Sequence, residues 1–126
     1  MIEGIFSQPN YLAAKKSLAA IALRQEAIAT NLANLETPGY KRLDLAPGFE
    51  RELQRACAAQ EPQQIASLKP TLTVDANAVA HSLDGNTVSL ESELMQLNQN
   101  VVAHTLETQL VTGTLLKLKL AITGKS

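Results

Sequence analysis

The sequence has few of the residues that cross-link a small protein or fill a thick core. Cys57 is the only cysteine, so neither an intramolecular disulfide nor a thiolate metal cluster can form. Aromatic residues make up only 3% of the chain, whereas alanine and leucine are frequent. Side chains of this small and branched kind suit closely packed helices better than a core built from rings.

Charge of one sign and long apolar runs are lacking as well. The formal net charge is −1, which gives no electrostatic reason to expect binding to nucleic acid or to an anionic membrane. The longest wholly apolar run, residues 18–23, is far shorter than the roughly 18 residues of a membrane-spanning helix. Residues 1–10 lack the basic and apolar regions of a secretory signal, so we expect no cleaved signal peptide.

Patterns that carry catalysis or metal binding are also missing. His81 and His104 are the only histidines, and no cysteine or carboxylate stands at metal-ligand spacing from them. Gly113-Thr114 falls inside an expected helix rather than after a strand, which argues against a phosphate-binding loop. We therefore expect no enzyme, no cofactor, no metal site and no small-molecule substrate.

The C-terminal part of the chain shows a long helical periodicity. Apolar residues at alternating spacings of four and three predict a helix over residues 89–123, with Ser89 as N-cap and Gly124 as the stop. Such a helix is about 50 Å long, whereas a compact globule of this size is only about 28 Å across. A second apolar row, which includes Leu106 and Leu110, runs beside the first and indicates more than one neighbour. The first row is the predicted assembly seam of this helix: Leu90, Leu94, Leu97, Val101, Val111, Leu115, Leu118 and Ile122.

The same spacing predicts an N-terminal helix over residues 9–36, with Asn10 as candidate N-cap. Pro38 disfavours a helical conformation at the preceding residue and ends this helix. Pro38-Gly39 then suits a type II turn in which Gly39 has a positive φ. The seam of this helix is predicted to contain Leu18, Ile21, Ile28 and Leu32.

The middle of the chain is less regular. A turn and an extended stretch are expected at 37–46, and a short helix at 47–59 with Pro47 in its first position. Residues 60–88 hold two prolines and scattered apolar residues, which predicts an irregular region that orders only against partners. Within it, residues 71–74 alternate as in a short β segment.

Together these elements predict a single domain, residues 1–126, with an all-α fold. Two long antiparallel terminal helices form a coiled-coil-like pair, joined by the short helix and the irregular loop region. The surplus apolar stripes favour assembly with other chains, although a self-contained helical hairpin is the alternative. Asn31, Asn34 and Tyr40 either close the turn locally or reach a neighbouring subunit.

Residues 24–40 resemble the N-terminal signature of bacterial flagellar rod and hook proteins. Residues 84–91, Asp-Gly-Asn-Thr-Val-Ser-Leu-Glu, resemble the lead-in to the final helix in the proximal rod branch of that family. The chain length, without a large inserted middle domain, also fits that branch. The shared core of the signature, Ala-Asn-x-x-Thr-Pro-Gly-Tyr, is matched here by Ala33, Asn34, Thr37, Pro38, Gly39 and Tyr40.

The resemblance implies a structural subunit of the periplasmic rod in the flagellar basal body, a part of the motility apparatus. It implies export through the flagellar type III apparatus, self-association, and contacts with the rod protein FlgC, distal-rod types, the FliE adaptor and the base formed by the export gate and membrane ring. An alternative of another class is a coiled-coil secretion chaperone or export adaptor.

Overall fold

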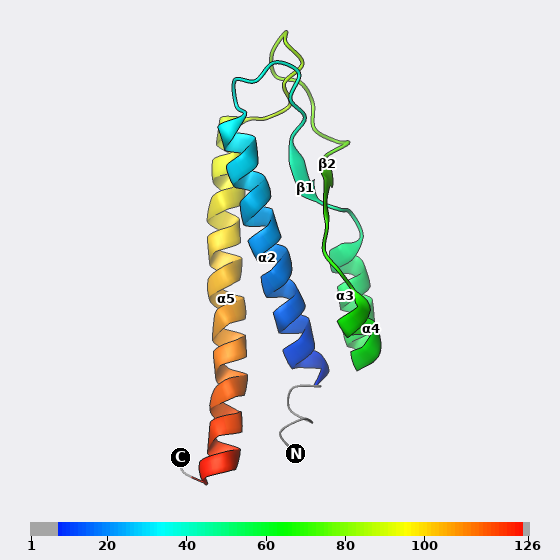
Figure 1. Cartoon of the computed structure of the whole chain (residues 1–126), viewed down its shortest axis with the longest axis vertical. Coiled ribbons are helices and arrows are strands. Elements are labelled where there is room, and N and C mark those ends of the chain that lie inside the picture. Colours follow the sequence, from blue (N-terminus) through cyan, green and yellow to red (C-terminus); the bar gives the residue numbers. More distant parts are fainter. Residues whose placement is uncertain (1–7, 125–126) are drawn as a thin grey trace.

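The computed structural model describes residues 8–124 and is mostly helical, which confirms the predicted fold class. Residues 1–7, which carry most of the argument about a signal peptide, and residues 125–126 lie outside the described part. Two long helices run antiparallel, side by side (Figure 1). In order, the elements are α2 (Pro9–Ala33), β1 (Leu43–Leu45), α3 (Phe49–Ala58), α4 (Pro62–Ser67), β2 (Leu72–Val74) and α5 (Leu90–Thr123).

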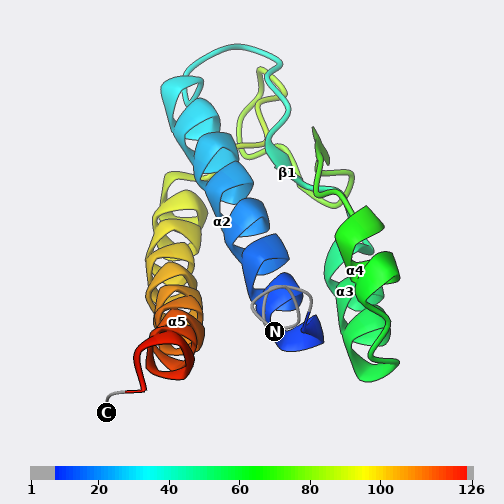
Figure 2. The same cartoon turned by 60° about the horizontal axis from the view of Figure 1, so that its bottom comes forward.

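Three layers of helices make up the molecule. Helix α2 lies between α5 on one side and the α3–α4 pair on the other (Figure 2). Its 25 residues span about 37 Å, whereas the 34 residues of α5 span about 51 Å. The C-terminal end of α5 therefore extends past the beginning of α2 (Figure 1). Along residues 8–124, the apolar stretches of the helices are too short or too polar for a membrane crossing.

The ends of α5 follow the sequence signals, whereas α2 begins at Pro9 as predicted but ends at Ala33 instead of residue 36. The Ser89 hydroxyl accepts a hydrogen bond from the Ser92 N–H at 3.4 Å, and Gly124 ends the helix at a φ of +66°. The predicted N-cap Asn10 is wrong, because α2 already begins at Pro9 and Gln8 is its cap. Proline is well suited to this first helical position, since its fixed φ is helical and an N–H is not needed there.

The region expected to be irregular carries regular structure of its own. Helix α4 and strand β2 both fall within residues 60–88, and β2 pairs antiparallel with β1 in the register Leu43↔Val74 and Leu45↔Leu72. Strand β2 confirms the β segment expected at 71–74, whereas the expectation of an irregular region ordered only by partners is wrong for α4. Ile65 is fully buried and packs α4 against the rest of the chain. The average composition of this polar segment does not reveal that contact.

The apolar core lies between α2 and the α3–α4 pair rather than between the two long helices. Helix α3 begins at Phe49, not Pro47, because its N-cap Gly48 has a left-handed φ of +95°. Half-buried side chains, among them that of Cys57, pack around the core. The buried cluster itself consists of Ala20, Phe49, Leu53, Ala56 and Ile65.

Candidate assembly surface

The predicted signature lies at the junction where α2 ends and the chain returns as β1. Asn31 is fully buried there. Its Oδ1 accepts hydrogen bonds from the Tyr40 hydroxyl at 3.0 Å and from the Leu43 N–H at 2.8 Å. Its Nδ2 donates to the Leu43 carbonyl at 2.9 Å and to Glu93 Oε2 at 3.3 Å. Asn31 and Tyr40 thus close the junction within the chain.

Asn34 and Gly39 shape the turn that follows α2. The Asn34 side chain donates to the Thr30 carbonyl at 2.8 Å and accepts from the Thr37 hydroxyl at 3.1 Å. The Tyr40 N–H bonds to the Thr37 carbonyl at 3.2 Å, which closes a four-residue turn around Pro38 and Gly39. Gly39 has a φ of +72°, as its place in the turn predicts.

Gly39→Val should destabilise the fold, because a β-branched residue is strained at this positive φ. Space does not explain the effect, since a Cβ on Gly39 would meet only the Asp84 carbonyl at 3.9 Å. We expect a loss of about 1–3 kcal/mol in the free energy of unfolding, measured by urea denaturation. Gly39→Asn is the matched control, because asparagine tolerates the left-handed region. Equal stability of the valine variant and the wild type would contradict this account.

A buried ion pair joins the junction to α5. Arg42 Nε donates to Glu93 Oε1 at 2.7 Å, and Glu93 is fully buried. The Arg42 guanidinium also pairs with Asp44 and Asp75. Burial disfavours the charge on Arg42, but the hydrogen bonds with Glu93 and Asp75 outweigh this and raise its pKa above the usual value. Burial, followed by the nearby Glu93 charge, raises the pKa of Tyr40.

Asn86 holds the loop before α5 against the end of α2. Its Nδ2 donates to the carbonyls of Asn34, Leu35 and Thr37 at 3.0, 3.1 and 2.7 Å. These carbonyls belong to the C-cap of α2 and to the turn that follows it, so Asn86 joins that turn to the loop before α5. The residues resembling the family lead-in thus serve the same junction as the N-terminal signature.

Asn86→Ala should lower the free energy of unfolding by about 1–3 kcal/mol, because it removes the three hydrogen bonds that the buried Asn86 amide donates to the turn after α2. Chemical denaturation followed by circular dichroism measures the change. Asn77→Ala is the control, since Asn77 is exposed and a surface change of this kind stays within about 0.5 kcal/mol. Comparable effects of both substitutions would contradict this role of Asn86.

The predicted seam divides between the inside and the outside of the molecule. Ile21, Ile28 and Leu118 are buried. Leu18, Leu32, Leu97 and Val111 are half-buried. The other five positions are 44–61% exposed: Leu90, Leu94, Val101, Leu115 and Ile122.

The face of α5 that contacts α2 is instead rich in polar residues. Glu93 and Asn100 are buried on it, and Glu107 is half-buried. Asn100 Nδ2 donates to the Ile21 carbonyl at 3.0 Å and to Gln25 Oε1 at 3.1 Å. Burial raises the pKa of Glu107, and a hydrogen bond with Ser17 offsets part of that rise. The long helices are therefore aligned by polar contacts, and the larger apolar rows of α5 stay outside.

Asn86 stood out in the sequence only as part of the family lead-in, and no role at this junction was predicted for Arg42, Glu93 or Asn100. One signal was available for α5, since Glu93, Asn100 and Glu107 recur every seven residues and therefore share one face of a helix. No comparable signal marks Arg42, whose partners come from three separate segments. Within residues 8–124, no group of three or more histidine, cysteine, aspartate or glutamate side chains could hold a metal ion.

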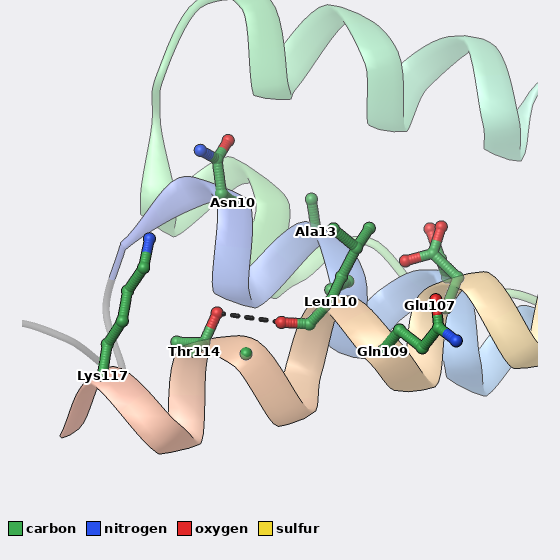
Figure 3. A pocket seen from close by; sticks show the side chains of 10 residues that line it. Asn10, Ala13, Glu107, Gln109, Leu110, Thr114 and Lys117 are labelled. Carbon is green, nitrogen blue, oxygen red and sulfur yellow. Dashed lines mark hydrogen bonds between the residues drawn. The ribbon is translucent and has the colours of Figure 1, made fainter. Parts of the chain in front are cut away.

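A groove runs along one flank of the two long helices. It encloses about 480 Å³ and is open to solvent on one side. Most side chains that line it are small or uncharged, with Glu107 at one end and Lys117 at the other (Figure 3). We call this surface the α2–α5 groove; its lining residues are Asn10, Ala13, Ala14, Ser17, Glu107, Gln109, Leu110, Gly113, Thr114 and Lys117.

Comparison with known proteins identifies the family. The family model described as flagella basal body rod protein matches residues 13–41, which include the signature at the end of α2. The flagellar basal body rod protein FlgB of Borrelia hermsii is 30% identical over 115 residues, covering 77% of this chain and 83% of that protein. The chain belongs to the FlgB family of flagellar basal body rod proteins.

Other FlgB proteins agree with this assignment. That of Cereibacter sphaeroides is 31% identical over 110 residues, covering 81% of this chain and 84% of its own length. That of Escherichia coli K12 is 29% identical over 109 residues, covering 73% and 77%. FlgB proteins are structural rather than enzymatic, so the polar junction is part of the architecture of a rod subunit and not of a catalytic site.

Proposed function

We propose that this chain polymerises through its terminal helices within the flagellar basal body rod. It is a proximal rod component and assembles with other rod components. One observation carries the proposal about the helices. Of the large apolar side chains exposed in the described part of the chain, eleven belong to α5. Exposed apolar surface of this extent marks an interaction site.

The electrostatic character of α5 supports packing against other helices. Between Val101 and Leu116, α5 has no lysine or arginine and a single histidine, His104. Its one carboxylate in this stretch, Glu107, lies on the side toward α2. Neighbouring subunits can thus cover the outer face of this stretch without burying a charge, which would be unfavourable. The apolar rows then become buried only in the polymer.

We also propose how this chain is exported and which proteins it contacts. Export through the flagellar type III apparatus without a cleaved signal peptide would bring the chain to the periplasm. FlgC, the distal-rod proteins, the FliE adaptor and the base formed by the export gate and membrane ring are the partners we propose. The alternative role as a secretion chaperone or export adaptor is set aside, because the chain belongs to a family of rod proteins.

The test is to purify basal bodies from cells that carry a tagged chain and to probe them for the tag. We expect the chain in the rod fraction, and we expect a deletion strain to lack rods and motility. A chaperone would stay in the cytoplasmic fraction. A deletion strain that still built complete, motile flagella would contradict the rod function.

A further inference from the structure

We infer that the α2–α5 groove of one subunit receives the exposed apolar edge of α5 from a second copy of this chain. The inference rests on the proposed rod function and names the surface and the partner for one contact. We call this edge the α5 ridge; it consists of Leu94, Val101, Thr108, Leu115 and Ile122.

The groove and the ridge lie on opposite flanks of the contact between the two long helices. A helix turns about 100° per residue, so Leu110, Gly113 and Lys117 fall on one side of the line through Asn100, Glu107 and Leu118, and the ridge falls on the other. In agreement, Val101 lines a different hollow, together with Ala22 and Gln25. A single subunit can therefore use both surfaces at the same time.

The two surfaces match in size and polarity. The groove offers small side chains, including Ala13, Ser17 and Gly113, and a Cβ built on Gly113 meets no atom within 4 Å. The ridge supplies four aliphatic side chains and one threonine, and it carries no charge.

The geometry also explains why the occupant is another copy. A contact between two different surfaces of the same molecule is head-to-tail, so each added subunit offers a fresh groove or a fresh ridge. Repeating this contact produces an open helical assembly rather than a closed pair. One such contact also covers the Leu115 and Val101 side chains, which the subunit itself leaves 44% and 55% exposed.

Cysteine cross-linking in purified basal bodies tests the contact. In a Cys57→Ser background, Gly113→Cys is combined in turn with Leu94→Cys, Val101→Cys or Ile122→Cys, so that the axial offset between copies need not be known. Within one chain these pairs are at least about 13 Å apart along the helix axis, at 1.5 Å per residue. A short bifunctional maleimide therefore reports contacts between chains.

We expect a ladder of dimers and higher multimers from at least one double-cysteine chain, and no dimers from any single-cysteine chain. Dimers from single-cysteine chains would show that like surfaces meet, which would overturn the inference. Cross-links only to another rod protein, or none with the chain present in basal bodies, would also overturn it while leaving the rod function intact. A wild-type chain absent from basal bodies would instead contradict the proposed function.

A substitution that fills the groove gives an independent measurement. Gly113→Leu should leave the thermal midpoint of the purified chain unchanged or higher, because leucine favours a helix more than glycine does. We expect at least tenfold less of this variant in basal bodies. Gly113→Ala, which also favours the helix but fills little space, should stay within twofold of the wild type. Wild-type incorporation of the leucine variant would overturn the inference.

Discussion

Replacing Arg42 by alanine should be the most damaging single change to the stability of this chain. Glu93 is fully buried, and Arg42 Nε is its partner at 2.7 Å. Removing one member of a buried ion pair leaves the other charge uncompensated, which costs about 3–5 kcal/mol. Native domains are stable by only about 5–15 kcal/mol. The variant should therefore unfold at much lower urea concentration in a denaturation curve followed by circular dichroism.

The stabilities of two further variants distinguish the loss of this ion pair from a general effect of losing an arginine. Arg51→Ala, at an exposed position of α3, should change the stability by no more than about 0.5 kcal/mol. The double variant Arg42→Met and Glu93→Leu should recover part of the loss, because apolar residues of similar volume can replace a buried pair. If Arg42→Ala unfolded at the wild-type urea midpoint, the junction would not depend on this pair.

Leu115→Asp should abolish incorporation into the rod and leave the isolated chain intact. Leu115 is 44% exposed on α5, so the free energy of unfolding should fall by no more than about 1 kcal/mol, largely through the lower helix propensity of aspartate. Covering this position in the polymer would bury an unpaired carboxylate, at a cost of about 3 kcal/mol or more. That cost corresponds to at least about a hundredfold loss of association. Motility in soft agar and the amount of chain in basal bodies measure the effect.

Two further variants serve as comparisons for Leu115→Asp. Leu115→Met keeps the volume and the apolar character and should support normal motility. Leu97→Asp should differ from both, because Leu97 is half-buried within the chain and the substitution should destabilise the isolated subunit as well. Normal motility of Leu115→Asp would contradict the assignment of the exposed rows to assembly.

Leu115 and Asn100 show that the face of α5 in contact with α2 could not be predicted from the sequence. Counting apolar residues correctly located the long helix α5 and its strongest stripe. It did not reveal that α2 would contact mainly another face, because the amide of Asn100 finds its acceptors, Ile21 O and Gln25 Oε1, only when the two helices lie together. The rotation of a helix about its axis depends on such pairings, which local periodicity does not contain.

The middle of the chain is more ordered than its composition predicts. Residues 60–88 have too few apolar residues to suggest a packed structure, yet Ile65 is fully buried and β2 pairs with β1. One well-placed side chain and a short ladder of backbone hydrogen bonds order a segment that composition describes as a loop. Strand β2 depends on a partner strand far away in the sequence, and the cluster around Ile65 reaches back to Ala20.

Local chemistry in the sequence was sufficient for the two long helices, for the turn at Pro38 and Gly39, for the Ser89 cap and for the family resemblance, because each depends on residues close together along the chain. The tertiary structure alone placed Glu93 beside Arg42, brought Asn86 to the end of α2 and left the leucine rows of α5 exposed. These features depend on which distant groups can satisfy one another's charges and hydrogen bonds, and that is decided only when the whole chain is folded.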